Sequence, residues 1–225
     1  MLSGLACPAP AKAQGPVDVA LVLAVDASAS VGREEFGLQM DGIAAALRTP
    51  DVHRAIRNGT HGAVAITLIE WSGPDQHWQA IPWTRVTDDR SAEALAVEIE
   101  NTPRLFATGG TAIGAAIRFS LASFADLPWP ADRKVIDISG DGSNGQGPPV
   151  APARELAWRQ GVTINGLPIL SQEKQIDFYY LSVVIVGNGS FIEIASDYNS
   201  FADAMTRKLV REIGSNPLLS LLKAE

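Results

Sequence analysis

Apolar residues occur along the chain in two ways, as short continuous runs and as segments with a helical repeat. The first continuous run, Val17–Val25, is apolar except at Asp18, and it is too short and too β-branched for a membrane span. Its length is typical of a strand buried on both faces. Similar runs predict strands at Ala63–Trp71, Gln76–Trp83, Lys134–Ser139, Val162–Leu170 and Leu181–Val186, with Phe191–Ala195 as a short edge strand or a helical turn.

Between these runs, apolar residues recur every three or four positions, which is the spacing of an amphipathic helix. In the first such segment, the shared face comprises Phe36, Met40, Ile43, Ala44 and Leu47. The pattern predicts helices at Arg33–Leu47, Ser91–Glu100, Ala112–Phe124, Ala151–Gln160 and Phe201–Ile213, with Ser91 as an N-cap. We expect that Asp51–Gly62 carries a short turn, and we interpret Ser171–Tyr180 as a polar, then aromatic, insertion.

Strands that alternate with helices predict a parallel sheet covered on both faces. Gln76–Trp83 follows its neighbour after a short turn, so the two strands form an antiparallel hairpin, and Pro82 suits an edge strand. The predicted fold class is α/β: a three-layer αβα, doubly wound, mostly parallel central sheet with one antiparallel edge strand. With 225 residues and 46% hydrophobic content, we expect one domain, 15–214, and a C-terminal tail, 215–225.

Three oxygen-bearing side chains follow the first strand, at Asp26, Ser28 and Ser30, with alanines between them. Side chains at every second position of an extended segment point the same way, so one carboxylate and two hydroxyls converge beyond the strand. Such hard oxygens suit a hard cation, Mg²⁺ before Mn²⁺ or Ca²⁺. The helix predicted to begin at Arg33 directs the positive end of its dipole toward the same place.

The motif Asp-x-Ser-x-Ser at the end of a buried strand resembles the opening of the metal-ion-dependent adhesion site of a von Willebrand factor A-type domain, which has a Rossmann-type topology. That family completes its site with a Thr in a later loop and an Asp after the fourth strand. Thr111 precedes a predicted helix, and Asp141 follows an apolar strand. Thr111 matches the family's ligand, while Thr108 is a competing threonine in the same loop. The resemblance covers about Val17 to Ile213.

The resemblance implies a single Mg²⁺ held by Asp26, Ser28, Ser30, Thr111 and Asp141, with the two aspartates binding directly or through water. Because Mg²⁺ keeps waters when protein ligands are few, one position stays exchangeable. In the resembled family, this position takes an Asp or Glu carboxylate of a partner protein. We therefore expect an interaction module that holds a protein partner through the metal. The oligomeric state stays open.

Catalysis has weaker support in the sequence, and we expect that the protein is not an enzyme. It lacks a Gly-x-Ser-x-Gly elbow and a Walker loop. His53, His61 and His77 fall in predicted loops or on the edge hairpin, and we expect them at the surface. One alternative is a Mg²⁺-dependent hydrolase or phosphatase with Asp26 as nucleophile. The other is a structural domain with a vestigial metal site.

A net charge of −7 argues against a nucleic-acid surface, which needs clustered Lys and Arg. No sequence window reaches the roughly 18 apolar residues of a membrane helix. Residues 1–14 are small and apolar, and Ala11-Lys12-Ala13 matches an A-x-A cleavage site, so they are a signal-peptide remnant or a disordered segment. We expect an exported, periplasmic protein. Lipoprotein anchoring at Cys7 is an alternative.

Overall fold

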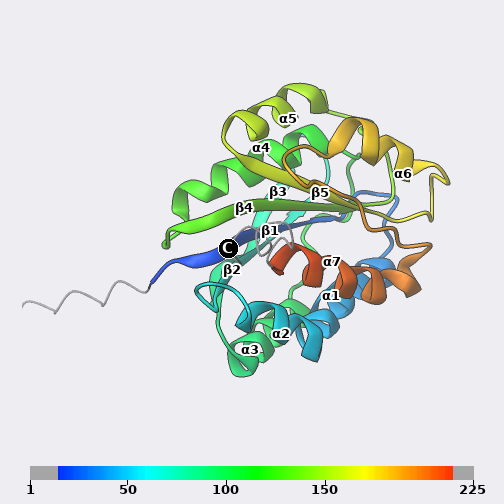
Figure 1. Cartoon of the computed structure of the whole chain (residues 1–225). Coiled ribbons are helices and arrows are strands. Elements are labelled where there is room, and N and C mark those ends of the chain that lie inside the picture. Colours follow the sequence, from blue (N-terminus) through cyan, green and yellow to red (C-terminus); the bar gives the residue numbers. More distant parts are fainter. Residues whose placement is uncertain (1–14, 215–225) are drawn as a thin grey trace, which may run out of the picture.

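The computed structural model describes residues 15–214. The expectations for residues 1–14, including Cys7, and for the tail lie outside the described residues. Within the described part, five strands form one sheet in the order β3-β2-β1-β4-β5 (Figure 1). Their bounds are β1 Val17–Asp26, β2 Val64–Trp71, β3 His77–Val86, β4 Ala131–Gly140 and β5 Val162–Pro168.

The sheet is parallel except at one edge. β1 lies at its centre and pairs in parallel with β2 and β4, and β5 continues the parallel order beyond β4. β3 pairs antiparallel with β2, and it carries Pro82 at the edge of the sheet. The predicted α/β fold class, with a mostly parallel sheet and one antiparallel edge strand, is therefore confirmed.

Helices cover both faces of the sheet (Figure 1). One face carries α1 Arg33–Leu47, α2 Pro50–Arg57, α3 Asp89–Glu100 and α7 Phe201–Ile213. The other carries α4 Ile113–Ser123, α5 Val150–Arg159 and α6 Ile176–Tyr179. Short helical turns at Phe124–Asp126, Tyr180–Val184 and Tyr198–Ser200 complete the helical segments. Among residues 15–214, no helix has both the length and the apolar character needed to cross a membrane.

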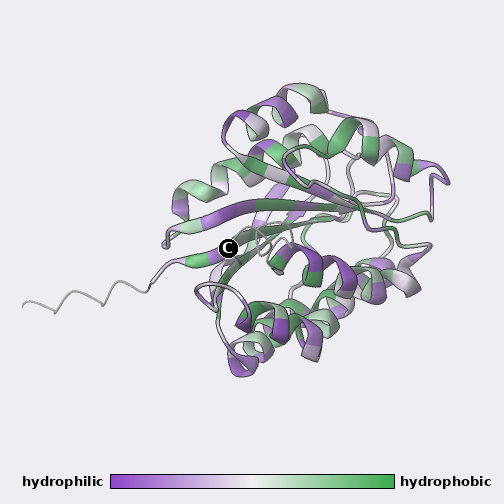
Figure 2. Cartoon of the chain, viewed as in Figure 1, coloured by the Kyte–Doolittle hydropathy of each residue, from purple (hydrophilic) through white to green (hydrophobic). Residues whose placement is uncertain are grey.

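The core consists of two apolar layers separated by the sheet. Every residue of β1 is buried, and successive side chains alternate between the layers. Leu21 and Leu23 pack in the layer beneath α1 and α7, whereas Val22 and Ala24 pack in the layer beneath α4 and α5. Figure 2 shows the result, with apolar residues gathered on the sheet and polar residues on the outer faces of the helices.

The short turn expected within Asp51–Gly62 occupies residues 58–62, but the rest of the segment belongs to the helix α2, which was not predicted. Thr49 is its N-cap and accepts a hydrogen bond from the Val52 N–H at 3.4 Å, and Pro50 occupies the first turn. A threonine followed by proline is a strong start signal for a helix. The segment is short, with only Val52 and Ile56 fully buried, so its apolar periodicity is weak.

The N-cap assigned to Ser91 is also wrong. Asp88 is the N-cap of α3, and its carboxylate accepts a hydrogen bond from the Ser91 N–H at 2.8 Å. The Ser91 hydroxyl in return accepts from the Asp88 N–H at 3.0 Å. This reciprocal pair places the N-cap three residues before the predicted position.

Leu181–Val186 is not a strand. α6 continues through a π-helical turn at Tyr180–Val184, so most of the apolar run is helical. In place of a sixth strand, single residues bridge to β5 or just beyond it, in the pairs Ile164 with Val186, Gly166 with Ile192 and Ile169 with Ala195. Of the two expectations for Phe191–Ala195, neither a full strand nor a helical turn forms; the segment lies along β5 and pairs intermittently.

Candidate metal centre

The loop after β1 brings together the first three predicted residues. Asp26 Oδ1 accepts a hydrogen bond from the Ser28 N–H at 2.7 Å, which turns the chain back over the strand end. The Ser28 and Ser30 hydroxyl oxygens lie 3.1 Å apart. Asp26 and Ser28 are buried, and Ser30 is partly exposed, so the cluster has one side open to solvent.

Asp141 joins this cluster from the neighbouring strand. β4 pairs in parallel with β1, with Ser139 opposite Val25, so the two strands end side by side. The Ser30 hydroxyl donates to Asp141 Oδ1 at 2.8 Å. Oδ2 of the same carboxylate accepts from Ser171 Oγ and from the Tyr198 hydroxyl, each at 3.1 Å. Three hydroxyl donors thus fix the position of Asp141.

Thr111 reaches the centre through the loop before α4. Its carbonyl oxygen accepts from the Gly145 and Gln146 N–H groups at 2.9 and 3.1 Å, which packs it against the loop after Asp141. The Ala29 N–H donates to the Gly109 carbonyl at 2.9 Å, so the threonine loop and the serine loop are tied together. Thr111 is partly buried, whereas Thr108 is exposed.

The electrostatics of the cluster centre on Asp26, whose side chain has no exposed surface. The pKa of Asp26 is raised to about 7, mainly because the side chain is buried and to a smaller extent by the nearby Asp141 charge, while hydrogen bonds from Ser28 oppose the rise. Among the described residues, Asp26 Oδ2 has no hydrogen-bond partner. A buried carboxylate oxygen without a partner is costly, because it has given up its hydration.

The residues fit a divalent cation. A β-carbon at Gly140 would lie 2.8 Å from Asp26 Oδ2, so glycine keeps a small space open beside that oxygen. A cation, or a water molecule bound to it, would supply the partner that Asp26 Oδ2 lacks. The surrounding donors are hydroxyl and carboxylate oxygens, which Mg²⁺ and similar hard ions prefer.

Several residues that hold the centre in place were not predicted. The Gln39 amide donates to the Asp26 carbonyl at 3.0 Å, and Arg104 Nη2 donates to the Ala27 and Ser28 carbonyls at 2.9 and 3.1 Å. Gln39 gave a signal in the sequence, since it is a polar residue beside the apolar face of its helix. Arg104 and Tyr198 gave none, because their contacts depend on the tertiary fold.

A second group of potential ligands lies at the opposite end of the strands, where β1 and β4 begin. Asp18, His61 and Asp132 each offer one ligand atom, all within 4.8 Å of one another. Asp18 also accepts hydrogen bonds from the His61 and Ala63 N–H groups at 2.9 and 3.2 Å. These bonds give Asp18 a structural role at the start of β2, with or without a metal.

The three histidines lie at the surface, and each makes a contact with a neighbouring residue. His53 Nε2 contacts the Leu47 carbonyl oxygen at 2.7 Å, and His61 Nε2 lies 3.1 Å from Asp132 Oδ2. The His77 ring packs edge-on against Phe119, with centroids 4.5 Å apart, and burial lowers its pKa. All three are partly exposed, so they lie at the surface as expected, although His53 belongs to the helix α2 and not to a loop.

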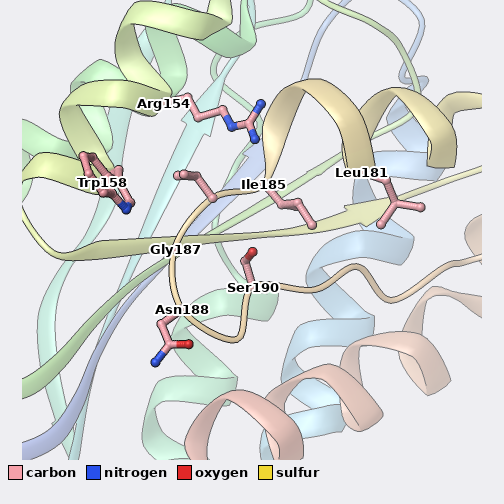
Figure 3. Close-up of a pocket in the computed structure, with 8 residues that line it drawn as sticks. Arg154, Trp158, Leu181, Ile185, Gly187, Asn188 and Ser190 are labelled. Atoms are coloured by element: carbon pink, nitrogen blue, oxygen red, sulfur yellow. The ribbon is translucent and has the colours of Figure 1, made fainter.

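A groove of about 500 Å³ lies between α5 and the segment that follows α6 (Figure 3). Arg154 and Trp158 of α5 line one side, and Leu181 and Ile185 line the other. Gly187 lies at its base, close to Thr163 near the start of β5. The groove is therefore separate from the centre around Asp26, which lies where the strands end.

The fold is that of von Willebrand A-type domains, and the Asp-x-Ser-x-Ser loop lies beside the loop before α4 and beside Asp141. Solved structures share the fold at low sequence identity. Proximal thread matrix protein 1 from the mussel byssus is 15% identical with a TM-score of 0.63, covering 89% of this chain and 49% of that one. The von Willebrand factor type A protein from Catenulispora acidiphila is 16% identical with a TM-score of 0.59, covering 89% and 44%.

The remaining comparisons concern a further solved structure, the family of the chain and the curated proteins. The von Willebrand domain of the pilus tip protein Mfa5 from Porphyromonas gingivalis is 12% identical with a TM-score of 0.58, covering 90% of this chain and 98% of that one. The chain spans about half of the mussel protein, one structure of which has a zinc-occupied adhesion motif. The chain belongs to the family described as "Protein of unknown function (DUF1194)", whose model matches residues 16–217. No curated protein matches it.

Proposed function

We propose that this protein is an exported, divalent-cation-binding interaction module. Its metal is Mg²⁺, held by Asp26, Ser28, Ser30, Thr111 and Asp141. When bound, the cation offers an exchangeable position to an Asp or Glu carboxylate of a protein partner. The roles of the chain's own residues are to hold the cation and to fix the loops around it.

The observation that carries this proposal is the unpartnered Asp26 Oδ2 in a fully buried side chain. The row of contacts from the Ser28 hydroxyl to the Ser30 hydroxyl, and from Ser30 to Asp141, supports it, because these groups supply the rest of a hard-oxygen donor set. The similar structures add support, since they include a mussel matrix protein with zinc in its adhesion motif and a pilus adhesin, SpaC from Lactobacillus rhamnosus GG. A pilus adhesin among the similar structures fits the proposed export.

The geometry favours a binding module over a phosphatase. A nucleophilic carboxylate must approach the phosphorus of its substrate, but Asp26 has no exposed surface and its Oδ1 is held by the Ser28 N–H at 2.7 Å. A phosphate group would have to enter the buried space beside Gly140. A partner carboxylate only has to reach the cation from the open side, near Ser30 and Thr111.

Isothermal titration of the full chain with MgCl₂ and with MnCl₂ tests the proposal. We expect saturable one-to-one binding that is lost in the Asp26→Ala/Ser28→Ala double variant. The matched control is His61→Ala/Asp132→Ala, which removes two potential ligands at the other end of the strands. Binding that survives Asp26→Ala/Ser28→Ala but is lost in the control would assign the metal to the Asp18 group and refute the proposal.

A further inference from the structure

The insertion Ser171–Tyr180 is built into the metal centre. The Ser171 hydroxyl donates to Asp141 Oδ2, and the fully buried side chain of Ile176 anchors the segment to the core. Tyr180 lies beneath the centre, since a β-carbon at Gly140 would be 3.0 Å from its hydroxyl and 2.8 Å from Asp26 Oδ2. The insertion therefore approaches the site at both of its ends, through Ser171 and Tyr180.

Within this segment, Glu173 brings a further carboxylate to the rim of the centre. Its Oε1 accepts hydrogen bonds from the Ser143 N–H at 2.9 Å and from the Ser143 hydroxyl at 3.0 Å. Ser143 is two residues beyond Asp141. Unlike Asp26 and Asp141, Glu173 is exposed, so its long side chain has room to change rotamer.

Gly142 separates Glu173 from Thr111 by a small open space. A β-carbon at position 142 would lie 3.4 Å from Thr111 Oγ1 and 3.6 Å from Glu173 Oε1. Both oxygens therefore border the same small volume, and one of them belongs to a residue proposed to hold the cation. A mobile carboxylate that borders the same space as a hydroxyl ligand is placed to reach a shared cation directly or through one bound water.

From this geometry we infer that Glu173 is an internal carboxylate ligand of the cation, which a partner's carboxylate has to displace. The inference rests on the proposed metal-binding function and deepens it. Ser143 holds Glu173 when the cation is absent. With the cation bound, Glu173 occupies the exchangeable position, so a partner must compete for it.

Mn²⁺ is a suitable probe, because electron paramagnetic resonance measures its affinity and water-proton relaxation reports the waters that remain on it. In Glu173→Gln we expect Mn²⁺ affinity to fall about tenfold and bound Mn²⁺ to gain roughly one exchangeable water. Acetate, a simple carboxylate, should then bind the Mn²⁺-loaded variant more tightly than the Mn²⁺-loaded wild type. Glu98→Gln, a change on the exposed face of α3, is the matched control and should alter none of these values.

A second variant moves the same quantities in the opposite direction. Ser143→Ala removes one of the two hydrogen bonds that hold Glu173 away from the cation, so we expect tighter Mn²⁺ binding and weaker acetate binding. Equal Mn²⁺ affinity, hydration and acetate binding in wild type and Glu173→Gln would overturn the role of Glu173 and leave the metal site standing. Absence of Mn²⁺ binding in both proteins would overturn both proposals.

Discussion

In the metal-free protein, the burial of the Asp26 side chain opposes its ionisation. The residue ends the central strand and has no exposed surface, and its pKa is raised to about 7 from an ordinary value of 3.8. Between these two pH values the folded state binds a proton that the unfolded state releases. The contribution of Asp26 to the free energy of unfolding therefore falls as pH rises from 3.8 to about 7.

We predict that Asp26→Asn stabilises the metal-free protein at neutral and alkaline pH. The neutral amide avoids the cost of a buried charge, so the gain grows with pH, at about 1.4 kcal/mol for each pH unit between the two pKa values, and then levels off. Urea unfolding in EDTA at about pH 5 and about pH 8 measures it. A variant that is no more stable at the higher pH would show that Asp26 is not a source of strain.

Asp126→Asn, a change at an exposed aspartate, is the control for this experiment and should leave the pH dependence unchanged. The same Asp26→Asn protein should also lose the stabilisation that Mg²⁺ gives to the wild type. A residue that destabilises the empty protein but is needed for ligand binding is typical of a functional site rather than of a structural one.

The sequence identified the ligand candidates of the centre but not the residues that position them. Asp26, Ser28 and Ser30 are local in sequence, so the alternation of an extended loop was enough to predict that they converge. Asp141 and Thr111 needed the resemblance to place them. Tyr198, which donates to Asp141 from 57 residues away, could not be predicted, because no local pattern marks a contact between distant loops.

At the scale of elements, α7 is fastened to the sheet by buried charges. Lys208 Nζ lies 3.1 Å from Asp137 Oδ1 of β4 and 2.6 Å from Glu212 Oε1 of its own helix. The Asn165 amide of β5 donates to the same Glu212 oxygen at 2.8 Å. Burial raises the pKa of Asp137 to about 7, although the Lys208 charge opposes the rise.

We predict that Lys208→Met destabilises the protein by about 3 to 5 kcal/mol at about pH 8, because it leaves two carboxylates buried without a cation. Without Lys208 the pKa of Asp137 rises further, so the loss should shrink as pH falls and the carboxylates take up protons. Thermal unfolding at about pH 8 and at lower pH values measures this loss of stability. Adding Asp137→Asn and Glu212→Gln should restore much of the stability, and a triple variant as weak as Lys208→Met would contradict this account.

The elements themselves were predicted best where one pattern dominated. β1 and α1 match their predicted positions closely, because each has a long, unbroken apolar pattern. The run Leu181–Val186 was ambiguous, since a short apolar run suits a buried helix as well as a strand, and here the helix α6 continues into it. The short helix α2 depended on its cap, which apolar spacing alone does not reveal.

Candidate cation ligands gather at both ends of the parallel strands. The loops after β1 and β4 and the loop before α4 surround Asp26 at one end, while Asp18, His61 and Asp132 lie at the other. A ligand that binds only the native state stabilises it, by about 2.7 kcal/mol at a concentration of 100 times its Kd. For a domain of this size, each kcal/mol raises Tm by roughly 2 to 4 °C.

We therefore predict that Tm is several degrees higher in Mg²⁺ than in EDTA. Hydrogen exchange should show which residues are stabilised. Amide protection should increase in residues 26–31, 109–112 and 140–146, which form the centre around Asp26, because the cation joins loops from three separate elements. Residues 59–63 and 131–133, where β2 and β4 begin, should exchange at unchanged rates. The opposite pattern would place the cation on Asp18, and a uniform rise in protection would mean that Mg²⁺ acts as a general salt rather than as a bound ligand.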